Sequence, residues 1–199
     1  GLNYRDHISE MNSQPGAEPV LFMKPSTALA SLEQPIAIPT TLGACHHEIE
    51  MAVLIGEQLS QCNEQEADAA IAGVGVALDL TLRELQSQLK QKGLPWDKAK
   101  AFDGACPTSA FVDRARVTDL QDLPIRLTVN GGLRQQSSTA MMLTPVTQLI
   151  AYISGFFTLM PGDIVLTGTP AGVGPLAPGD QLLVELGDLI AVSAEVVAR

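Results

Sequence analysis

Three carboxylates lie in segments whose other residues are mostly apolar. Glu48 and Glu50 are separated only by Ile49, and Asp79 closes the next apolar run. Burying an ionised carboxylate is costly, so acids in such segments are typically paired, protonated or bound to a cation. An all-carboxylate ligand set favours Mg²⁺ or Mn²⁺ over Zn²⁺, which prefers His and Cys. The pattern predicts a Mg²⁺ or Mn²⁺ site; the alternative is that Glu-x-Glu marks the solvent face of an amphipathic strand.

Two further pairs of polar residues are spaced three apart in segments that read as helices. His7 and Glu10 would share one helix face, where the carboxylate orients the imidazole; the alternative is an ordinary surface pair. Arg83 and Gln86 would project together from the first turns of a helix that begins just after Asp79. A cation and an amide beside a metal site suggest an anionic oxygen ligand.

The glycine-rich segment 166–174 resembles a phosphate-binding loop only superficially. No Gly-Lys-Ser/Thr follows it, and Pro175, Pro178 and Gly179 prevent the helix whose N-terminus would hold a phosphate. We interpret the segment as a tight loop whose Thr hydroxyls and backbone amides would face a small carboxylate. A purely structural turn is the alternative.

The elements that must position these residues are predicted from periodicity and turn signals. Residues 44–55 have a strand-like pattern that includes both glutamates, and an apolar run that follows a short acidic helix at 64–70 ends at Asp79. Asn3 is predicted to cap a short helix through His7 and Glu10. The capping-box pattern at 81–84 predicts a helix that ends at Gly93.

The C-terminal half is predicted to be mainly β, with one helix. Thr144 followed by Pro145 predicts that helix's start, and Gly155 its end. Residues 123–130 read as a strand followed by a turn at 131–132, and Pro-Gly-Asp turns at 161–163 and 178–180 each introduce another β-like segment.

Composition limits the partners and the organisation of the chain. With 199 residues, 46% of them hydrophobic, residues 1–199 fit one globular domain. The net charge of −10 opposes binding to nucleic acid or to an anionic membrane surface.

We expect no membrane span, because the longest apolar stretch, 69–78, is far shorter than the roughly 20 residues required, and no signal sequence is visible. Three cysteines without C-x-x-C spacing indicate a reducing compartment, and Cys106 is given no catalytic role.

Several motifs, taken together and in order, resemble the fumarylacetoacetate hydrolase family, in its short acylpyruvase and oxaloacetate decarboxylase branch. The motifs are Gly1-Leu2-Asn3-Tyr4-Arg5-Asp6-His7, Phe22-Met23-Lys24-Pro25-Ser26, His47-Glu48-Ile49-Glu50, Asp79-Leu80-Thr81, Gly93-Leu94-Pro95-Trp96 with Lys100, and Leu166-Thr167-Gly168-Thr169-Pro170. The resemblance covers nearly the whole chain, which begins inside the first motif, so a family strand is expected before residue 1. It implies a mixed α/β, mainly β fold: a β-sandwich roll with flanking helices, as a homodimer with one Mg²⁺ or Mn²⁺ per subunit.

The same resemblance implies roles for individual residues. The metal would be held by Glu48, Glu50 and Asp79, and the catalytic residues would be His7, Glu10 and Lys100. The carboxylate end of the substrate would contact Arg83, Gln86 and Thr169.

The implied activity is metal-dependent hydrolysis of the C–C bond of acylpyruvate-type 2,4-dioxo acids, or decarboxylation of oxaloacetate, through a metal-stabilised enolate. The alternative is an isomerase or tautomerase acting on hydroxymuconate-type dienoates or on oxaloacetate. A non-catalytic binding protein with the same fold is a second alternative. The expected location is the cytoplasm, or the mitochondrial matrix in a eukaryote.

Overall fold

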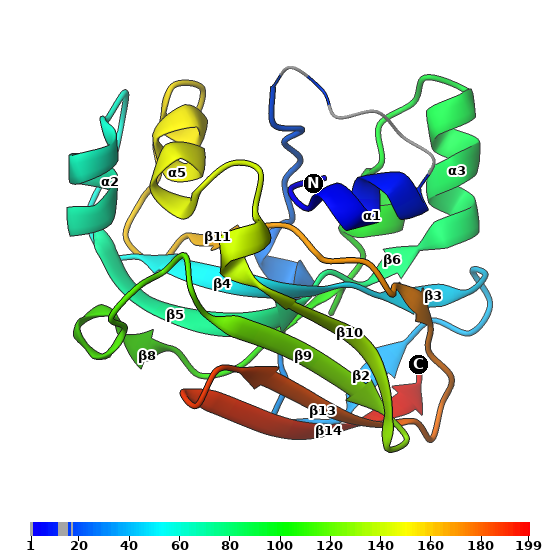
Figure 1. Ribbon diagram of the computed structural model, residues 1–199. Coiled ribbons are helices and arrows are strands. Elements are labelled where there is room, and N and C mark those ends of the chain that lie inside the picture. The colour runs from blue at the N-terminus through cyan, green and yellow to red at the C-terminus, as the bar shows by residue number, and fades with distance from the viewer. Residues whose placement is uncertain (1, 12–15, 17) are drawn as a thin grey trace.

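The computed structural model describes residues 2–11, 16 and 18–199, and its centre is an antiparallel strand pair (Figure 1). Strands β4 (Ile49–Ile55) and β5 (Ile71–Leu78) are almost entirely buried, because helices cover one face of their sheet and a second sheet covers the other. This explains why both strands are apolar on both faces. The remaining strands of this six-stranded sheet are β1 (Leu29–Ser31), β7 (Cys106–Thr108), β8 (Val112–Asp113) and β11 (Ile164–Leu166).

The second sheet has five strands in the order β10-β9-β13-β14-β2. Strands β9 and β13 alternate buried and more exposed residues, so one face of this sheet packs on the core and the other faces outward. Its strands are β2 (Ile36–Ile38), β9 (Pro124–Val129), β10 (Gly132–Ser138), β13 (Gln181–Leu186) and β14 (Ile190–Ala198). The layering confirms the predicted mixed α/β, mainly β architecture.

A small third sheet joins segments that are far apart in the sequence. It contains β3 (Cys45–His47), β6 (Thr81–Leu82) and β12 (Gly174–Pro175), with β3 in the middle. The predicted continuous strand over 44–55 is therefore wrong, because the chain changes sheets at Glu48, which belongs to neither β3 nor β4. This change of sheet places the start of β4 beside the end of β5.

Helices cover the upper face of the six-stranded sheet in Figure 1. They are α1 (Arg5–Glu10), α2 (Glu64–Ala69), α3 (Arg83–Gln91) and α5 (Val146–Ser154). The other helical segments are α4 (Asp97–Lys100) and the 3₁₀ turns η1 (Ser26–Ala28), η2 (Arg114–Arg116) and η3 (Thr139–Met141). The four predicted helices are confirmed, including the termination of α5 at Gly155. Among the described residues, no helix combines the length and apolar character needed to cross a bilayer.

Three residues placed at predicted helix starts do not cap their helices, and in two of them, Asn3 and Thr81, the side chain makes another contact instead. The Asn3 side-chain amide donates to the carbonyls of Thr144 (3.0 Å) and Thr167 (2.8 Å), and so ties the N-terminal segment to two distant loops. The Thr81 side chain lies in β6 and donates to the carbonyl of Asp79 at 3.0 Å. Thr144 does not cap α5, and its amide donates to Asn3 at 2.8 Å.

Candidate active site

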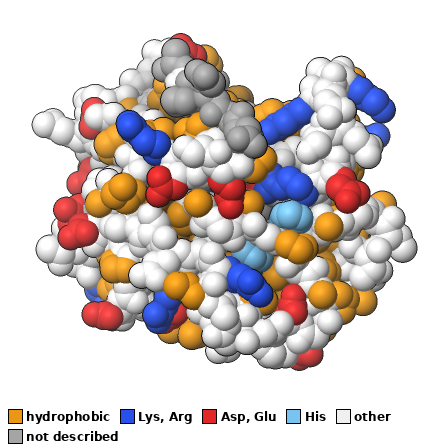
Figure 2. Space-filling view, turned by 45° about the vertical axis from the view of Figure 1, so that its right-hand side comes forward, with side chains coloured by type: hydrophobic (Ala, Val, Ile, Leu, Met, Phe, Trp, Pro, Cys, Tyr) orange, Lys and Arg blue, Asp and Glu red, His pale blue; other side chains and the backbone are white. Residues whose placement is uncertain are grey.

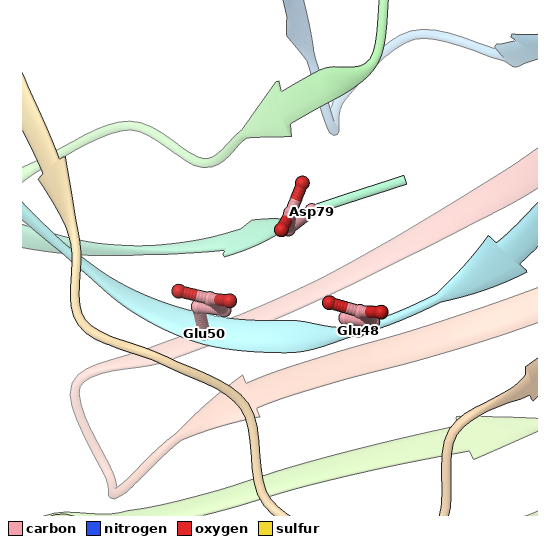
Figure 3. A group of neighbouring side chains, drawn as sticks. All are labelled: Glu48, Glu50 and Asp79. Carbon is pink, nitrogen blue, oxygen red and sulfur yellow. The ribbon is translucent and has the colours of Figure 1, made fainter. Parts of the chain in front are cut away.

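The carboxylates of Glu48, Glu50 and Asp79 converge, with one oxygen from each lying within 4.8 Å of the others. The register of the central strand pair explains this: Ile49 pairs with Leu78, so the residues just beyond this pair, Glu48 and Asp79, are neighbours. Their backbones are joined by a 2.8 Å hydrogen bond from the Asp79 amide to the Glu48 carbonyl. Figure 3 shows Glu48 and Glu50 on the same side of the chain with Asp79 facing them, and all three are buried.

Two lysines neutralise part of this negative charge. Lys100, itself buried, places Nζ 2.7 Å from Glu48 Oε2, 2.6 Å from Asp79 Oδ2 and 2.7 Å from the Thr81 hydroxyl. Lys24 Nζ lies 2.7 Å from Asp79 Oδ1, although the contact lacks the angles of a hydrogen bond. Asp79 therefore contacts two ammonium groups.

Glu48 and Glu50 differ in their compensation. Glu48 forms a second ion pair, with Arg83. In the part of the chain that the structure describes, no Lys or Arg pairs with Glu50, and its Oε2 accepts a 2.5 Å hydrogen bond from the amide of Gly168. Among the three acids, Glu50 is therefore the one whose negative charge is least compensated by the described basic side chains.

The pKa shifts follow these contacts. Burial raises the pKa of Glu50 to about 8, and the charge of Asp79 adds to the effect. Burial acts in the same direction on Glu48, but the charges of Lys100 and Arg83 outweigh it and hold the pKa of Glu48 below its usual range. Burial alone would lower the pKa of Lys100, whereas Asp79 and Glu48 raise it. The metal-free site therefore holds a protonated Glu50 at neutral pH beside an ionised Glu48.

This donor set fits a hard divalent cation. Three carboxylates from two adjacent chain segments provide only oxygen ligands, which suits Mg²⁺ or Mn²⁺. Glu50, which pairs with no Lys or Arg of the described residues, is the ligand whose ionised form a cation would stabilise most. Glu48, Glu50 and Asp79 are therefore the residues that would hold the ion.

The metal-free protein is expected to lose stability as the pH rises from about 5 to 8. The pKa of Glu50 is about 8 in the folded chain against an ordinary value of 4.5, so folding takes up a proton in this range. This contribution to the free energy of unfolding is complete below the unfolded-state pKa of 4.5 and is lost as the pH rises through the folded-state pKa of about 8. Between the two, the free energy of unfolding falls by up to about 1.4 kcal/mol per pH unit. Urea unfolding in EDTA at a series of pH values measures the slope. Metal-free Glu50→Gln should lack this component, and identical slopes in the two proteins would contradict the assignment.

The predicted pair on α1 is formed. His7 Nδ1 lies 3.0 Å from Glu10 Oε2, and Glu10 Oε1 accepts a 3.0 Å hydrogen bond from the amide of Gly172. Glu10 therefore orients the imidazole and also ties α1 to the loop after β11. The ring of His7 is buried, and the residue lines the adjoining pocket.

A pocket of about 40 Å³ is lined by both His7 and Glu48, and so connects α1 to one carboxylate of the cluster. Arg83 Nη1 donates to Gln86 Oε1 at 2.9 Å, so these two residues are held together on α3 as predicted. Figure 2 shows Lys and Arg side chains gathered in the hollow beside α3 at the upper right. The pocket is lined by Leu2, His7, Met11, Val20, Phe22, Glu48, Arg83, Gln86, Lys90, Trp96 and Lys100.

Thr169 does not line this pocket, and its neighbours reveal a network that sequence reasoning missed. Its hydroxyl accepts a 2.9 Å hydrogen bond from Gln135 Nε2. Gln135, which is fully buried, also contacts His47 Nδ1 (2.9 Å) and accepts from the Ile49 amide (3.0 Å) through Oε1, and donates to the Pro170 carbonyl at 2.8 Å. Gln135 thus joins the loop carrying Thr169 to the strand carrying the glutamates.

Two further residues near the carboxylates, Lys24 and Tyr4, lie in the family-like motifs at 22–26 and 1–7, but the sequence did not predict a functional role for either. Lys24 contacts Asp79 and donates to the carbonyls of Lys100 and Ala105, the latter at 3.1 Å. Tyr4 is buried, and its hydroxyl has no hydrogen-bond partner in the described part of the chain. The signal for Lys24 was its place in a motif shared by the resemblance; the unpaired phenol of Tyr4 is visible only in the folded chain.

A wider and shallower depression of about 340 Å³ lies elsewhere, between α2, η2 and the start of α5. None of the predicted site residues lines it. Its charged side chains Arg114 and Asp68 pair with each other at 2.8 Å. We therefore place the site at the small pocket beside the carboxylates.

Comparison with known proteins agrees with this placement. Residues 1–197 match the family model described as fumarylacetoacetate hydrolase, C-terminal. The chain is 57% identical over 185 residues to oxaloacetate tautomerase YcgM of Escherichia coli, covering 92% of this chain and 84% of that protein. It is 42% identical over 196 residues to the human mitochondrial oxaloacetate tautomerase FAHD1, covering 98% of this chain and 89% of that protein.

Solved structures show the same fold. A fumarylacetoacetate hydrolase family protein from Yersinia pestis superposes with a TM-score of 0.97 at 54% identity, covering 98% of this chain and 90% of that one. Fumarylpyruvate hydrolase from Pseudomonas aeruginosa, in complex with Mn²⁺ and pyruvate, superposes with a TM-score of 0.94 at 34% identity, covering 100% and 87%. This chain therefore belongs to the fumarylacetoacetate hydrolase family, in the short branch that includes the oxaloacetate tautomerases of E. coli and human.

Proposed function

We propose that this protein interconverts the keto and enol forms of oxaloacetate or a closely related 2-oxo dicarboxylic acid, with Mg²⁺ or Mn²⁺ held by Glu48, Glu50 and Asp79. The observation that carries the reaction is the 57% identity, over 92% of the chain, to a protein named oxaloacetate tautomerase. The comparisons thus favour tautomerisation, the alternative activity expected from the sequence, over the hydrolysis and decarboxylation that were the main expectation.

The charges of the site support a dianionic substrate. Glu48, Glu50 and Asp79, when ionised, are balanced by three basic side chains within the same cluster, those of Lys24, Arg83 and Lys100. A divalent ion added to this balanced set leaves an excess of two positive charges. A 2-oxo dicarboxylate neutralises that excess, and a low-dielectric site penalises a large uncompensated charge.

Proton transfer is assigned to the residues on α1. His7 would take a proton from C3 of the keto form and return it to the C2 oxygen, which moves the double bond and regenerates the imidazole. Glu10, 3.0 Å from His7 Nδ1, would hold the ring and stabilise its protonated form. Lys100 would keep a positive charge near the oxygen on which negative charge develops. When bound, the divalent ion would act as a Lewis acid toward the 2-oxo acid.

Substrate binding is assigned to residues around the same pocket. Arg83 and Gln86, joined at 2.9 Å, would present donors to the C1 carboxylate. Thr169 does not line the pocket, so its substrate contact rests on the family resemblance alone, and its hydroxyl is fixed by Gln135 in the loop after β11. These assignments match the roles that the family resemblance implied.

Hydrolysis of an acylpyruvate is the second candidate. It is favoured by the likeness to fumarylpyruvate hydrolase, which is 34% identical and whose structure contains Mn²⁺ and pyruvate. In this reaction His7 would instead activate water for attack on the distal carbonyl. Decarboxylation of oxaloacetate needs the same charge stabilisation without water.

A product-resolved assay with oxaloacetate separates these reactions. We expect accelerated keto–enol exchange by NMR at unchanged total substrate, loss of this acceleration in EDTA, and a decrease of about a hundredfold or more for His7→Gln. Ser9→Ala, on the same helix, is the matched control. Release of pyruvate as fast as tautomerisation would favour the lyase, and fast cleavage of acetylpyruvate with slow tautomerisation would favour the hydrolase. An unchanged rate in His7→Gln would remove this residue from proton transfer.

A further inference from the structure

Lys90 is a basic residue of the pocket to which no role has yet been assigned. Arg83, Gln86 and Lys90 are spaced three and four residues apart on α3, so they form one stripe of the helix, and all three line the pocket. Lys90 is exposed, whereas Gln86 is buried. The stripe therefore runs from the carboxylate cluster, which Arg83 contacts, toward solvent at Lys90.

The other cations near the pocket are already engaged. Lys100 contacts three acceptors, Lys24 contacts Asp79, and Arg83 is shared between Glu48 and Gln86. Within the described ranges, 2–11, 16 and 18–199, no carboxylate forms an ion pair with Lys90. Lys90 therefore retains a positive charge for a ligand.

The environment of Lys90 is also suited to an anion. Its Nζ lies 4.7 Å from the ring centroid of Trp96, another residue of the pocket, which restricts where the ammonium group is held. Burial, followed by the charges of Arg83 and Lys100, lowers the pKa of Lys90. Arg83 and Lys100 repel the Lys90 ammonium and Glu48 attracts it, and a ligand carboxylate placed among the three cations would offset the remaining repulsion.

We propose that Lys90 is a specificity-determining residue that binds the distal carboxylate of a 2-oxo dicarboxylic acid. This inference rests on the proposed function for its substrate class. Arg83 and Gln86 hold the C1 end beside the carboxylate cluster, and the continuation of the same helix stripe reaches the other end of the substrate. Selection of a dicarboxylate over a substrate with a neutral distal group then depends on one charge on α3.

The test compares oxaloacetate with its 4-ethyl ester, in which an uncharged ester replaces the distal carboxylate. Lys90→Met keeps an unbranched side chain, one atom shorter, and removes the charge. We expect KM for oxaloacetate to rise about tenfold or more, KM for the ester to stay within about twofold, and kcat for both to change little. Lys90→Arg should restore most of the discrimination. Lys92→Met, just beyond the same helix and outside the pocket, is the matched control.

Binding provides a second measurement that does not depend on turnover. Difluorooxaloacetate has no C3 proton, so calorimetric titration of the Mn²⁺-loaded protein reports affinity alone, and pyruvate serves as the ligand without a distal carboxylate. Lys90→Met should weaken difluorooxaloacetate about tenfold and leave pyruvate unchanged. Equal losses for both ligands, or no loss for either, would overturn the inference. Wild-type protein that binds difluorooxaloacetate through Lys90 but tautomerises neither substrate would overturn the proposed function and leave the role of Lys90 standing.

Discussion

Glu50→Gln should abolish tight binding of Mg²⁺ or Mn²⁺ and lower kcat by about a thousandfold, yet leave the metal-free protein as stable as the metal-free wild type at pH 6. The loss corresponds to removal of the dominant electrostatic contribution to stabilising a developing oxyanion, about 3–4 kcal/mol by analogy with other enzymes. The preserved stability follows from the protonation state. Because the pKa of Glu50 is raised to about 8, the carboxyl is neutral at pH 6, and a glutamine has nearly the same shape and charge.

The hydrogen bonding of Glu50 makes this substitution specific. Its Oε2 accepts from the Gly168 amide at 2.5 Å, and a glutamine carbonyl accepts the same bond. The variant therefore differs from the protonated wild type mainly in its inability to ionise. Calorimetric titration with Mn²⁺ and urea unfolding in EDTA measure the two quantities separately. Glu57→Gln, at an exposed glutamate, is the matched control. Retained Mn²⁺ affinity, or a marked loss of metal-free stability, would contradict the role given to Glu50.

The shared direction of Glu48 and Glu50 was predictable because it depends on local geometry. Alternation along a strand places Glu48 and Glu50 on one side, and a carboxylate at the end of the neighbouring apolar run is well placed to meet them. The helix spacing of His7 and Glu10 likewise predicted their contact at 3.0 Å. What was not predictable is the strand register, which sets Ile49 opposite Leu78 and brings Asp79 to Glu48.

The helix caps failed for the opposite reason. Thr81 carries the sequence pattern of a capping residue, but its hydroxyl is needed by the carbonyl of Asp79 and by the buried Lys100. Asn3 similarly makes its bonds to residues more than a hundred positions away. Local propensity is outweighed where a buried polar group in another segment requires the same side chain.

Gln135 and Lys90 show two different limits of sequence reasoning. Gln135 lies on β10 of the second sheet and reaches the site only because the two sheets stack, so no spacing within its own segment indicates its role. Lys90 is on the helix already assigned to substrate binding, one stripe position beyond Gln86. Its relevance becomes apparent once the neighbouring cations are seen to be paired and Trp96 is seen to lie beneath it.

Lys100→Met should lower the stability of the metal-free protein by about 3–5 kcal/mol, because it leaves buried acids without their partner. Lys100 Nζ contacts Glu48 at 2.7 Å and Asp79 at 2.6 Å, and the lysine is buried. Lys24 and Arg83 retain one contact each, so the fold is weakened rather than lost. Urea unfolding in EDTA measures the loss, and Lys98→Met, an exposed lysine on the same short helix, is the control.

The same variant should bind Mn²⁺ at least as tightly as the wild type, in contrast to Glu50→Gln. Removing Lys100 removes a positive charge that competes for Glu48 and Asp79, so a divalent ion would meet two carboxylates that each retain only one cationic partner. Binding of the ion to the folded chain alone would then restore much of the lost stability. Catalysis should nevertheless fall about a hundredfold, since no ammonium group remains beside the developing negative charge. Weaker Mn²⁺ binding in Lys100→Met would show that the lysine orients the carboxylates for the metal, and unchanged kcat would show that its charge acts only on the fold.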